Sequence, residues 1–205
     1  IRDACRQQEF KHSGFHPQTK ELQWENVNLP VSVMLRLEIY FRNYGRTFPF
    51  SDNFKDHSVD SGHFQRCYIP FGVHHDSKKR HNPDRPDAEC NTPGFAILIP
   101  MDEGPHLNTI FWKEKFYNNN DMTKMFFDFG SLDAKDVKNS GIGDKYDLAF
   151  ADDNPDRKIY NHLTVDCIFN WKFGDAAVFD RTQLHAATDF TKHHQYKDAI
   201  TVFFN

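Results

Sequence analysis

The chain has 205 residues, a formal net charge of −4 and a hydrophobic content of 39%. This length and composition fit one domain with a sizeable core, residues 1–205, although length alone leaves two small domains open. The acidic balance argues against a binder of duplex nucleic acid, and no apolar run is long enough to span a membrane.

Aromatic residues dominate the candidate core, with 21 phenylalanines against only 4 methionines. Phenylalanines in short β-like runs predict the wide interior of a sandwich or barrel. The four cysteines are scattered without a CxxC pair, which argues against a zinc ribbon and favours a reducing, cytoplasmic location.

The first predicted element covers residues 31–44, where apolar residues recur at every second position from Val31 to Phe41. This alternation favours a half-buried strand. Met34 and Tyr40 interrupt the pattern and leave a helix open.

The next elements surround a polar segment. Residues 65–73 are predicted to form a strand, and residues 77–91, which contain Asn-Pro and Arg-Pro breakers, are predicted to form a loop. The apolar run 95–100 ends in proline and predicts a strand buried on both faces. Residues 108–116 form the next predicted strand.

Residues 117–160 are predicted to be an irregular polar insertion. Long segments of this kind inside compact domains commonly act as lids or binding loops. Strands are predicted again at 164–171, 176–179 and 199–204, so the predicted β-rich core runs from about residue 31 to residue 205.

His74 and Asp76 are the first candidate metal ligands. Along a strand alternate side chains share a face, so these two residues point the same way and His75 points the opposite way. His185, after an apolar strand and a polar exit, is the candidate third ligand. Two imidazoles and one carboxylate with open coordination positions suit non-haem Fe(II). A single His-x-Asp pair is weak, since a chain with 12 histidines contains such pairs by chance.

The surroundings of these residues resemble the Fe(II)- and 2-oxoglutarate-dependent oxygenases, especially small phage-like and bacterial members. The proximal motif of that family is similar to Tyr68-Ile69-Pro70-Phe71-Gly72-Val73-His74-His75-Asp76. An apolar strand ending in Pro100, a strand that is similar to the family's Asn-Thr-x-x-Phe strand (here Asn108-Thr109-Ile110-Phe111-Trp112) and a Gly-Asp turn before His185 follow in the family's order. The resemblance covers roughly residues 65–205 without the insertion.

The resemblance implies a mainly β fold, a double-stranded β-helix (jelly-roll, cupin-like) with a few flanking helices. It implies that His74, Asp76 and His185 hold Fe(II), with 2-oxoglutarate and O2 as co-substrates. The expected reaction is hydroxylation or another oxidation of a C–H bond in a small-molecule or peptide substrate. The presence of Asp76 favours this over halogenation, because halogenating relatives replace the acid with a small residue.

The resemblance also assigns co-substrate contacts. Lys197 occupies the place of the basic residue that anchors the far carboxylate of 2-oxoglutarate, although most relatives carry arginine there. Lysine offers a point charge and not a bidentate fork. Thr109 is a candidate hydroxyl donor, and Tyr68, which opens the proximal motif, is a further candidate contact. Arg181 competes with Lys197 as the anchor or faces the substrate.

Two other functions remain open at this point. A cupin-like Zn(II) hydrolase or isomerase can use the same three ligands and does not need Lys197. A jelly-roll binding module without enzymatic activity is the second alternative. The basic run at residues 78–80 is either a solvated loop or a contact with an anionic substrate. The sequence determines neither the substrate nor the oligomeric state.

Overall fold

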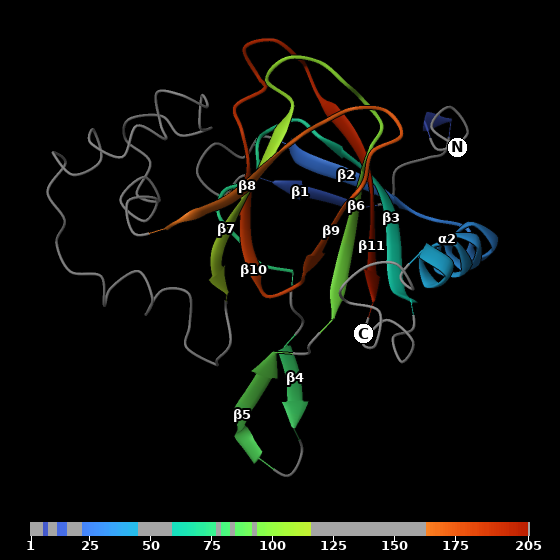
Figure 1. The fold of residues 1–205 in the computed structure, drawn as a ribbon, viewed down its shortest axis with the longest axis vertical. Coiled ribbons are helices and arrows are strands. Elements are labelled where there is room, and N and C mark those ends of the chain that lie inside the picture. Colours follow the sequence, from blue (N-terminus) through green and yellow to red (C-terminus); the bar gives the residue numbers. More distant parts are fainter. Residues whose placement is uncertain are drawn as a thin grey trace, which may run out of the picture.

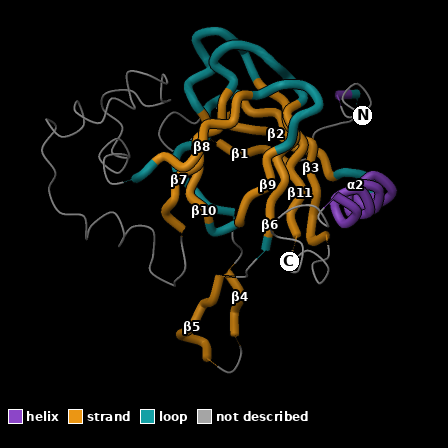
Figure 2. Tube along the Cα trace, viewed as in Figure 1, coloured by secondary structure: helices purple, strands orange, loops and turns teal. Residues whose placement is uncertain are grey.

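Strands account for most of the regular structure. The computed structural model describes residues 6–7, 12–15, 22–44, 59–76, 79–82, 85–91, 94–115 and 163–204. Its elements are β1 (His12–Phe15), β2 (Leu22–Asn28), α2 (Val31–Tyr44), β3 (Val59–Cys67), β4 (Lys79–Asn82), β5 (Arg85–Asn91), β6 (Phe95–Pro100), β7 (Asn108–Lys115), β8 (Val165–Asn170), β9 (Ala177–Asp180), β10 (Gln183–Ala187) and β11 (Lys197–Phe204). The predicted mainly β fold is therefore confirmed (Figure 2).

Two antiparallel sheets form the body of the molecule (Figure 1). The large sheet has six strands in the order β1-β2-β3-β11-β6-β9, and the small sheet has three in the order β10-β7-β8. Strands far apart in the sequence, such as β3 and β11, are therefore neighbours. The rings of Phe111 in β7 and Phe179 in β9 lie 4.8 Å apart between their centroids and join the sheets. The sheets face one another across a shared core.

Alternation along β11 separates the two faces of the large sheet. Its outer face buries a cluster built from Phe64, Ile97, Ile200, Val202 and Phe204. The alternate residues of β11 line an interior cavity: Lys197, Ala199, Thr201 and Phe203. Because successive side chains of a strand point to opposite faces, one strand serves both the outer core and the cavity.

Residues 31–44 form helix α2, and the strand predicted for them is wrong. One side of the helix packs Val33, Met34 and Leu37 against the outer cluster of the large sheet. The other side leaves Val31, Leu35 and Ile39 exposed, at 66%, 52% and 60%. Apolar residues on both sides of a helix imitate the two-residue period of a strand. Within the described residues, no helix is long and apolar enough to cross a membrane.

The loop predicted for residues 77–91 is also wrong, since β4 and β5 form a separate two-stranded hairpin (Figure 1). Lys79 pairs with Asn91, and Asn82 pairs with Arg85. A proline is compatible with β5 because an edge strand of a two-stranded ribbon leaves one row of backbone groups unpaired. The insertion expected at residues 117–160 lies outside the described residues.

The remaining strand predictions are largely confirmed. Strands β6, β7, β8, β9 and β11 match the predicted segments to within a few residues. The strand expected at 65–73 differs, because β3 begins at Val59 and ends at Cys67. A polar segment was expected to follow the apolar strand before His185, but the structure has the buried strand β10 there, which pairs with β7. Polar residues there are buried because a neighbouring strand covers them.

Candidate active site

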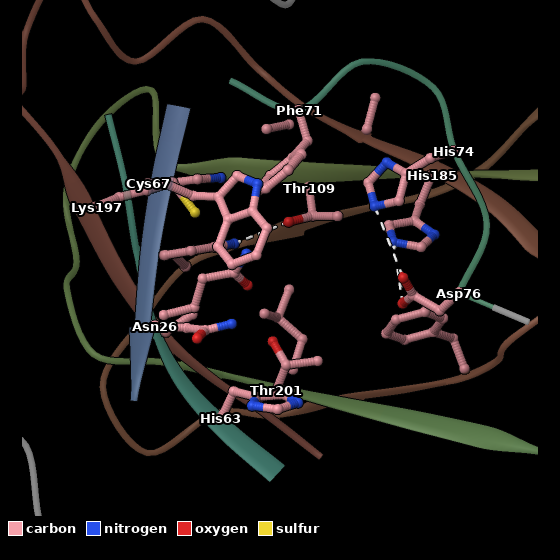
Figure 3. Close-up of a pocket in the computed structure, with 18 of the residues that line it drawn as sticks. Asn26, His63, Cys67, Phe71, His74, Asp76, Thr109, His185, Lys197 and Thr201 are labelled. Carbon is pink, nitrogen blue, oxygen red and sulfur yellow. Dashed lines mark hydrogen bonds and ion pairs between the residues drawn. The ribbon is translucent and has the colours of Figure 1, made fainter. Parts of the chain in front are cut away.

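A cavity of about 300 Å³ lies between the two sheets (Figure 3). One wall is the inner face of the large sheet, and Thr109 of β7 and His185 of β10 belong to the small sheet. Cross-strand register arranges the large-sheet wall in rows: Trp24, Cys67 and Lys197, then Asn26, Gln65 and Ala199, then His63 and Thr201. The cavity is therefore built by strands distant in sequence.

His74, Asp76 and His185 converge at one side of this cavity (Figure 3). Their ligand atoms all lie within 4.8 Å of one another. Oxygens of Asp76 lie 3.4 Å from His185 Nε2 and 3.8 Å from His74 Nε2. Two backbone hydrogen bonds of 3.0 Å join His74 to His185, so these two residues are neighbours although they are far apart in sequence. The structure thus brings together the three residues that the sequence indicated as ligands.

The second ring nitrogen of each histidine faces a backbone carbonyl. His74 Nδ1 lies 2.7 Å from the oxygen of Gly72, and His185 Nδ1 lies 3.0 Å from the oxygen of Gln183. A carbonyl can only accept, so each Nδ1 donates and each Nε2 keeps the lone pair that binds a metal. Burial lowers the pKa of His185 to about 4, which keeps its imidazole neutral at pH 7. Two imidazoles and a carboxylate fit Fe(II).

Arg181 holds the backbone of Asp76 from behind the cavity. Its guanidinium is 1% exposed, and Nε donates to the carbonyl oxygen of Asp76 at 3.0 Å. The Asp76 N–H donates to the Arg181 carbonyl at 2.8 Å, and Nη1 of Arg181 lies 3.6 Å from Asp60 Oδ2. Burial lowers the pKa of this guanidinium. Arg181 is not among the residues that line the cavity, so it is placed to fix a candidate metal ligand.

Lys197 lies on the opposite side of the cavity from Asp76 (Figure 3). It is 4% exposed, and Nζ lies 4.2 Å from the ring centroid of Trp171 and 5.1 Å from that of Phe190. Burial lowers the pKa of Lys197 to about 8. No carboxylate in the described part of the chain forms an ion pair with it. A buried ammonium without an anion is unfavourable, so this position suits an anionic ligand.

Thr109 lies between Lys197 and the histidines in the view of Figure 3. Its Oγ1 accepts a hydrogen bond of 3.0 Å from Nε1 of Trp171. Since the indole N–H can only donate, the hydroxyl hydrogen of Thr109 is available for an acceptor in the cavity.

Tyr68 is the predicted co-substrate contact that the structure separates from the others. Its hydroxyl donates to Glu25 Oε2 at 3.0 Å, and its ring meets that of Tyr196 edge-on, with centroids 6.3 Å apart. Tyr68 does not line the cavity.

Several cavity residues belong to no motif in the sequence. Asn26, His63, Gln65 and Thr201 line the wall formed by the large sheet. The period of two along β3 is visible in the sequence, with His63 and Gln65 on one face and Phe64 on the other. A polar face that points inward has the same sequence pattern as one that meets solvent, so the alternation alone did not identify these residues.

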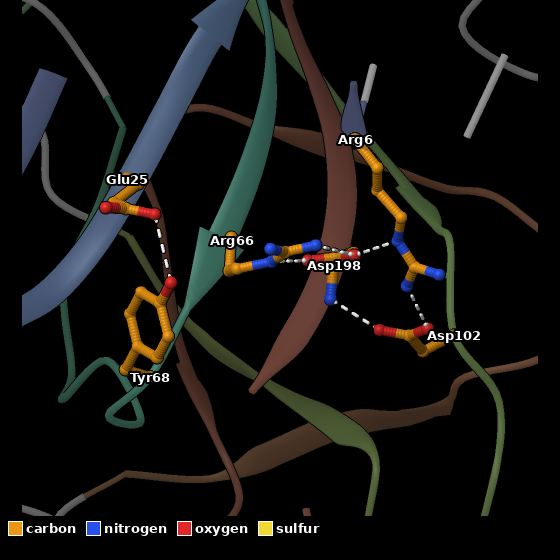
Figure 4. Close-up of polar contacts among 6 residues, drawn as sticks. All are labelled: Arg6, Glu25, Arg66, Tyr68, Asp102 and Asp198. Carbon is orange, nitrogen blue, oxygen red and sulfur yellow. Dashed lines mark hydrogen bonds and ion pairs between the residues drawn. The ribbon is translucent and has the colours of Figure 1, made fainter. Parts of the chain in front are cut away.

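Asp198 fixes the beginning of β11, next to Lys197 (Figure 4). Its side chain is fully buried and accepts from Arg66 Nε at 2.9 Å and from Arg6 Nε at 2.6 Å. The backbone N–H of Asp198 donates to Asp102 Oδ2 at 2.6 Å. These charge-assisted bonds hold the strand from the side opposite the cavity.

No protein-family model matches the sequence, and no curated protein matches it. Solved structures do match the fold. HygX from Streptomyces hygroscopicus, crystallised with nickel and 2-oxoglutarate, is 12% identical, with 100% of this chain and 76% of HygX covered and a TM-score of 0.53. This chain shares its fold.

Two enzymes from nogalamycin biosynthesis have the same fold. The non-haem α-ketoglutarate-dependent carbocyclase SnoK is 14% identical, with 97% of this chain and 68% of SnoK covered and a TM-score of 0.51. The epimerase SnoN, crystallised with Fe3+, α-ketoglutarate and nogalamycin RO, is 11% identical, with 99% of this chain and 70% of SnoN covered and a TM-score of 0.51. At these identities the likeness concerns the fold, and the chemistry must be argued from the side chains of this chain.

Proposed function

We propose that this chain is an Fe(II)- and 2-oxoglutarate-dependent oxygenase on a double-stranded β-helix, with residues 1–205 as a single domain. The observation that carries this proposal is one cavity with two chemically distinct sides. Two imidazoles and a carboxylate converge on one side, and the buried Lys197 without an anionic partner lies on the other. The fold shared with HygX, SnoK and SnoN supports the same function.

In this proposal His74, Asp76 and His185 would hold Fe(II) through two Nε2 atoms and a carboxylate. Iron bound there supplies the redox chemistry by which O2 and 2-oxoglutarate are consumed and a substrate C–H bond is oxidised. Lys197 pairs with the far carboxylate of 2-oxoglutarate, and the Thr109 hydroxyl donates to the same group. Arg181 keeps Asp76 in place through its backbone carbonyl.

Aromatic side chains shield the reacting centre from water. The ring centroid of Phe179 lies 4.8 Å from that of His185, and the ring of Phe71 lies 5.5 Å from that of His74. Exclusion of water strengthens the pairing of Lys197 with a carboxylate, since the interaction of two charges increases as the local dielectric constant falls.

We expect hydroxylation of a small-molecule or peptide substrate in the cytoplasm. SnoN was crystallised with nogalamycin RO and HygX with hygromycin B, which supports the small-molecule class. Free thiols at Cys67 and Cys167 support a reducing compartment. Because an epimerase and a carbocyclase share the fold, analysis of the product is needed to identify the outcome of the oxidation.

The decisive experiment measures 2-oxoglutarate binding and turnover. Calorimetry with Ni(II)-loaded protein should show stoichiometric binding of 2-oxoglutarate, and Fe(II)-loaded protein in air should release succinate. Lys197→Met should weaken 2-oxoglutarate binding by roughly 30-fold or more, the usual cost of removing one member of a buried charge pair. Lys172→Met, which removes an exposed lysine, is the matched control and should bind normally.

Protein that binds the metal but neither binds nor decarboxylates 2-oxoglutarate is not this oxygenase. Metal-dependent hydrolysis or isomerisation that is indifferent to Lys197→Met would instead support the Zn(II) enzyme. Protein that takes up no metal through His185 would support the binding module.

A further inference from the structure

The cavity contains hydrogen-bonding groups that the proposed mechanism does not use. Asn26 of β2 and Gln65 of β3 are cross-strand partners, and Thr201 of β11 is the partner of His63 in the next row. All four side chains line the cavity. Figure 3 shows Asn26, His63 and Thr201 along the side away from His74 and Phe71.

One of these groups lacks a partner. Oδ1 of Asn26 is buried and forms no hydrogen bond within the described residues. His63 is different, since its Nδ1 lies 3.0 Å from Asn28 Oδ1 and its ring lies against Phe203 with centroids 6.3 Å apart. A buried acceptor without a partner is costly, so a molecule in the cavity is the natural source of the missing donor.

Charge limits what that molecule can be. Among the cavity-lining residues that the structure describes, the carboxylate is Asp76 and the ammonium is Lys197. The proposed function uses both, one for the metal and one for 2-oxoglutarate. Cys67 stays a neutral thiol, since burial raises its pKa to about 12. What remains for a substrate is a wall that contains amide and hydroxyl groups and the His63 ring, and no further carboxylate or ammonium.

The volume of the cavity further limits which molecule can bind there. At about 300 Å³ the cavity is at the lower end of the roughly 300–1,000 Å³ typical of ligand pockets. Part of this space is needed for 2-oxoglutarate. Only a small portion of a substrate therefore fits beside the metal, next to Asn26, Gln65 and Thr201.

We propose that the substrate presents an uncharged, hydroxyl-bearing group to Asn26, Gln65 and Thr201, and that these residues determine substrate specificity. This inference rests on the proposed oxygenase function. Asn26 Oδ1 accepts from a substrate hydroxyl, and the Gln65 amide and the Thr201 hydroxyl each offer a donor and an acceptor to its neighbours. Carboxylates and phosphates are disfavoured here, because they would lose hydration without gaining a cation.

The first test separates substrate contacts from co-substrate contacts. Calorimetry compares 2-oxoglutarate binding to Ni(II)-loaded wild type, Asn26→Leu, Gln65→Met, Thr201→Val and Lys197→Met. The first three variants replace a polar group by an apolar one of similar shape and should change the affinity less than twofold, whereas Lys197→Met should weaken it roughly 30-fold or more. An equally large loss in Gln65→Met or Thr201→Val would assign the polar wall to 2-oxoglutarate and overturn the inference. If wild type itself does not bind 2-oxoglutarate, the proposed function fails first.

The second test uses matched neutral and anionic compounds: D-glucose with D-glucuronate, and myo-inositol with myo-inositol 1-phosphate. Saturation-transfer NMR on the protein loaded with Ni(II) and 2-oxoglutarate should detect the neutral member of a pair and not the anionic one. The double variant Asn26→Leu/Gln65→Met should reduce that binding roughly tenfold, whereas Asn170→Leu, an exposed amide on β8, should not. Preference for the anionic members, no binding of either, or binding that the double variant leaves unchanged would each overturn the inference.

Discussion

Lys197 combines a charge with nearly complete burial, and this has a measurable consequence for stability. Burial lowers its pKa to about 8 from the ordinary 10.5. Between these values the unfolded chain binds more protons than the folded chain, so this residue makes the free energy of unfolding rise with pH. The contribution reaches roughly 3 kcal/mol between pH 8 and 10.5.

Comparison with Lys197→Met isolates this contribution. Cys67 acts in the opposite direction above pH 9, because its raised pKa keeps the folded chain protonated there. Denaturant unfolding of both proteins, without 2-oxoglutarate, should therefore show wild type gaining stability relative to the variant from pH 8 to 10.5. A constant difference over this range would contradict the assignment of a buried, unpaired ammonium.

Arg181 links the stability of the fold to the candidate metal site. Replacing it by methionine removes the Nε–H that holds the Asp76 carbonyl and the guanidinium charge that lies 3.6 Å from Asp60 Oδ2. We expect Arg181→Met to lose about 2–4 kcal/mol of unfolding free energy and roughly tenfold in metal affinity. Arg36→Met, on the exposed side of α2, is the control for loss of a guanidinium. Unchanged Ni(II) affinity in Arg181→Met would show that Asp76 does not depend on it.

At the scale of elements, β11 is held from outside so that its inner face can carry Lys197. Asp198→Asn weakens the ion pairs to Arg6 and Arg66 that fix the start of this strand (Figure 4). The expected loss is about 2–3 kcal/mol, with weaker 2-oxoglutarate binding because Lys197 is the preceding residue. Asp189→Asn, in an exposed turn where Asp189 accepts from Thr191, should change stability by less than about 0.5 kcal/mol. Normal 2-oxoglutarate binding in Asp198→Asn would separate the ion pairs from the site.

The elements also differ in how well the local sequence pattern predicted them. The run at β6 has one interpretation, because six consecutive apolar residues ending in proline match a buried strand. Helix α2 was misassigned because its outer side is also apolar and imitates an alternating strand, and only the interruptions at Met34 and Tyr40 favoured a helix. Strand β10 was missed because its polar residues are buried only once β7 pairs beside them.

At the scale of the whole molecule, the proposed metal should bind the folded chain and not the unfolded one, since its ligands come from segments far apart in sequence. A free metal concentration 100 times the dissociation constant should raise the unfolding free energy by about 2.7 kcal/mol. Thermal unfolding with Ni(II) under saturating conditions tests this. His185→Ala should abolish the metal-induced shift, whereas His193→Ala, an exposed histidine, should retain it. A shift that survives His185→Ala would place the metal elsewhere.

The sequence by itself determined the mainly β class, most strand positions and the identities of His74, Asp76 and His185 as candidate ligands. The class and the strand positions follow from local periodicity and residue type, and the candidate ligands follow from motifs that resemble those of an oxygenase family. Only the tertiary structure decided that Lys197 faces the cavity without an anion, that Tyr68 pairs with Glu25 outside it, and that Arg181 supports Asp76 from behind. The inward orientation of the polar face of β3 was also decided only by the tertiary structure. Burial and pairing depend on contacts between strands that are distant in sequence, and these contacts form only when the two sheets pack together. Local periodicity therefore does not predict them.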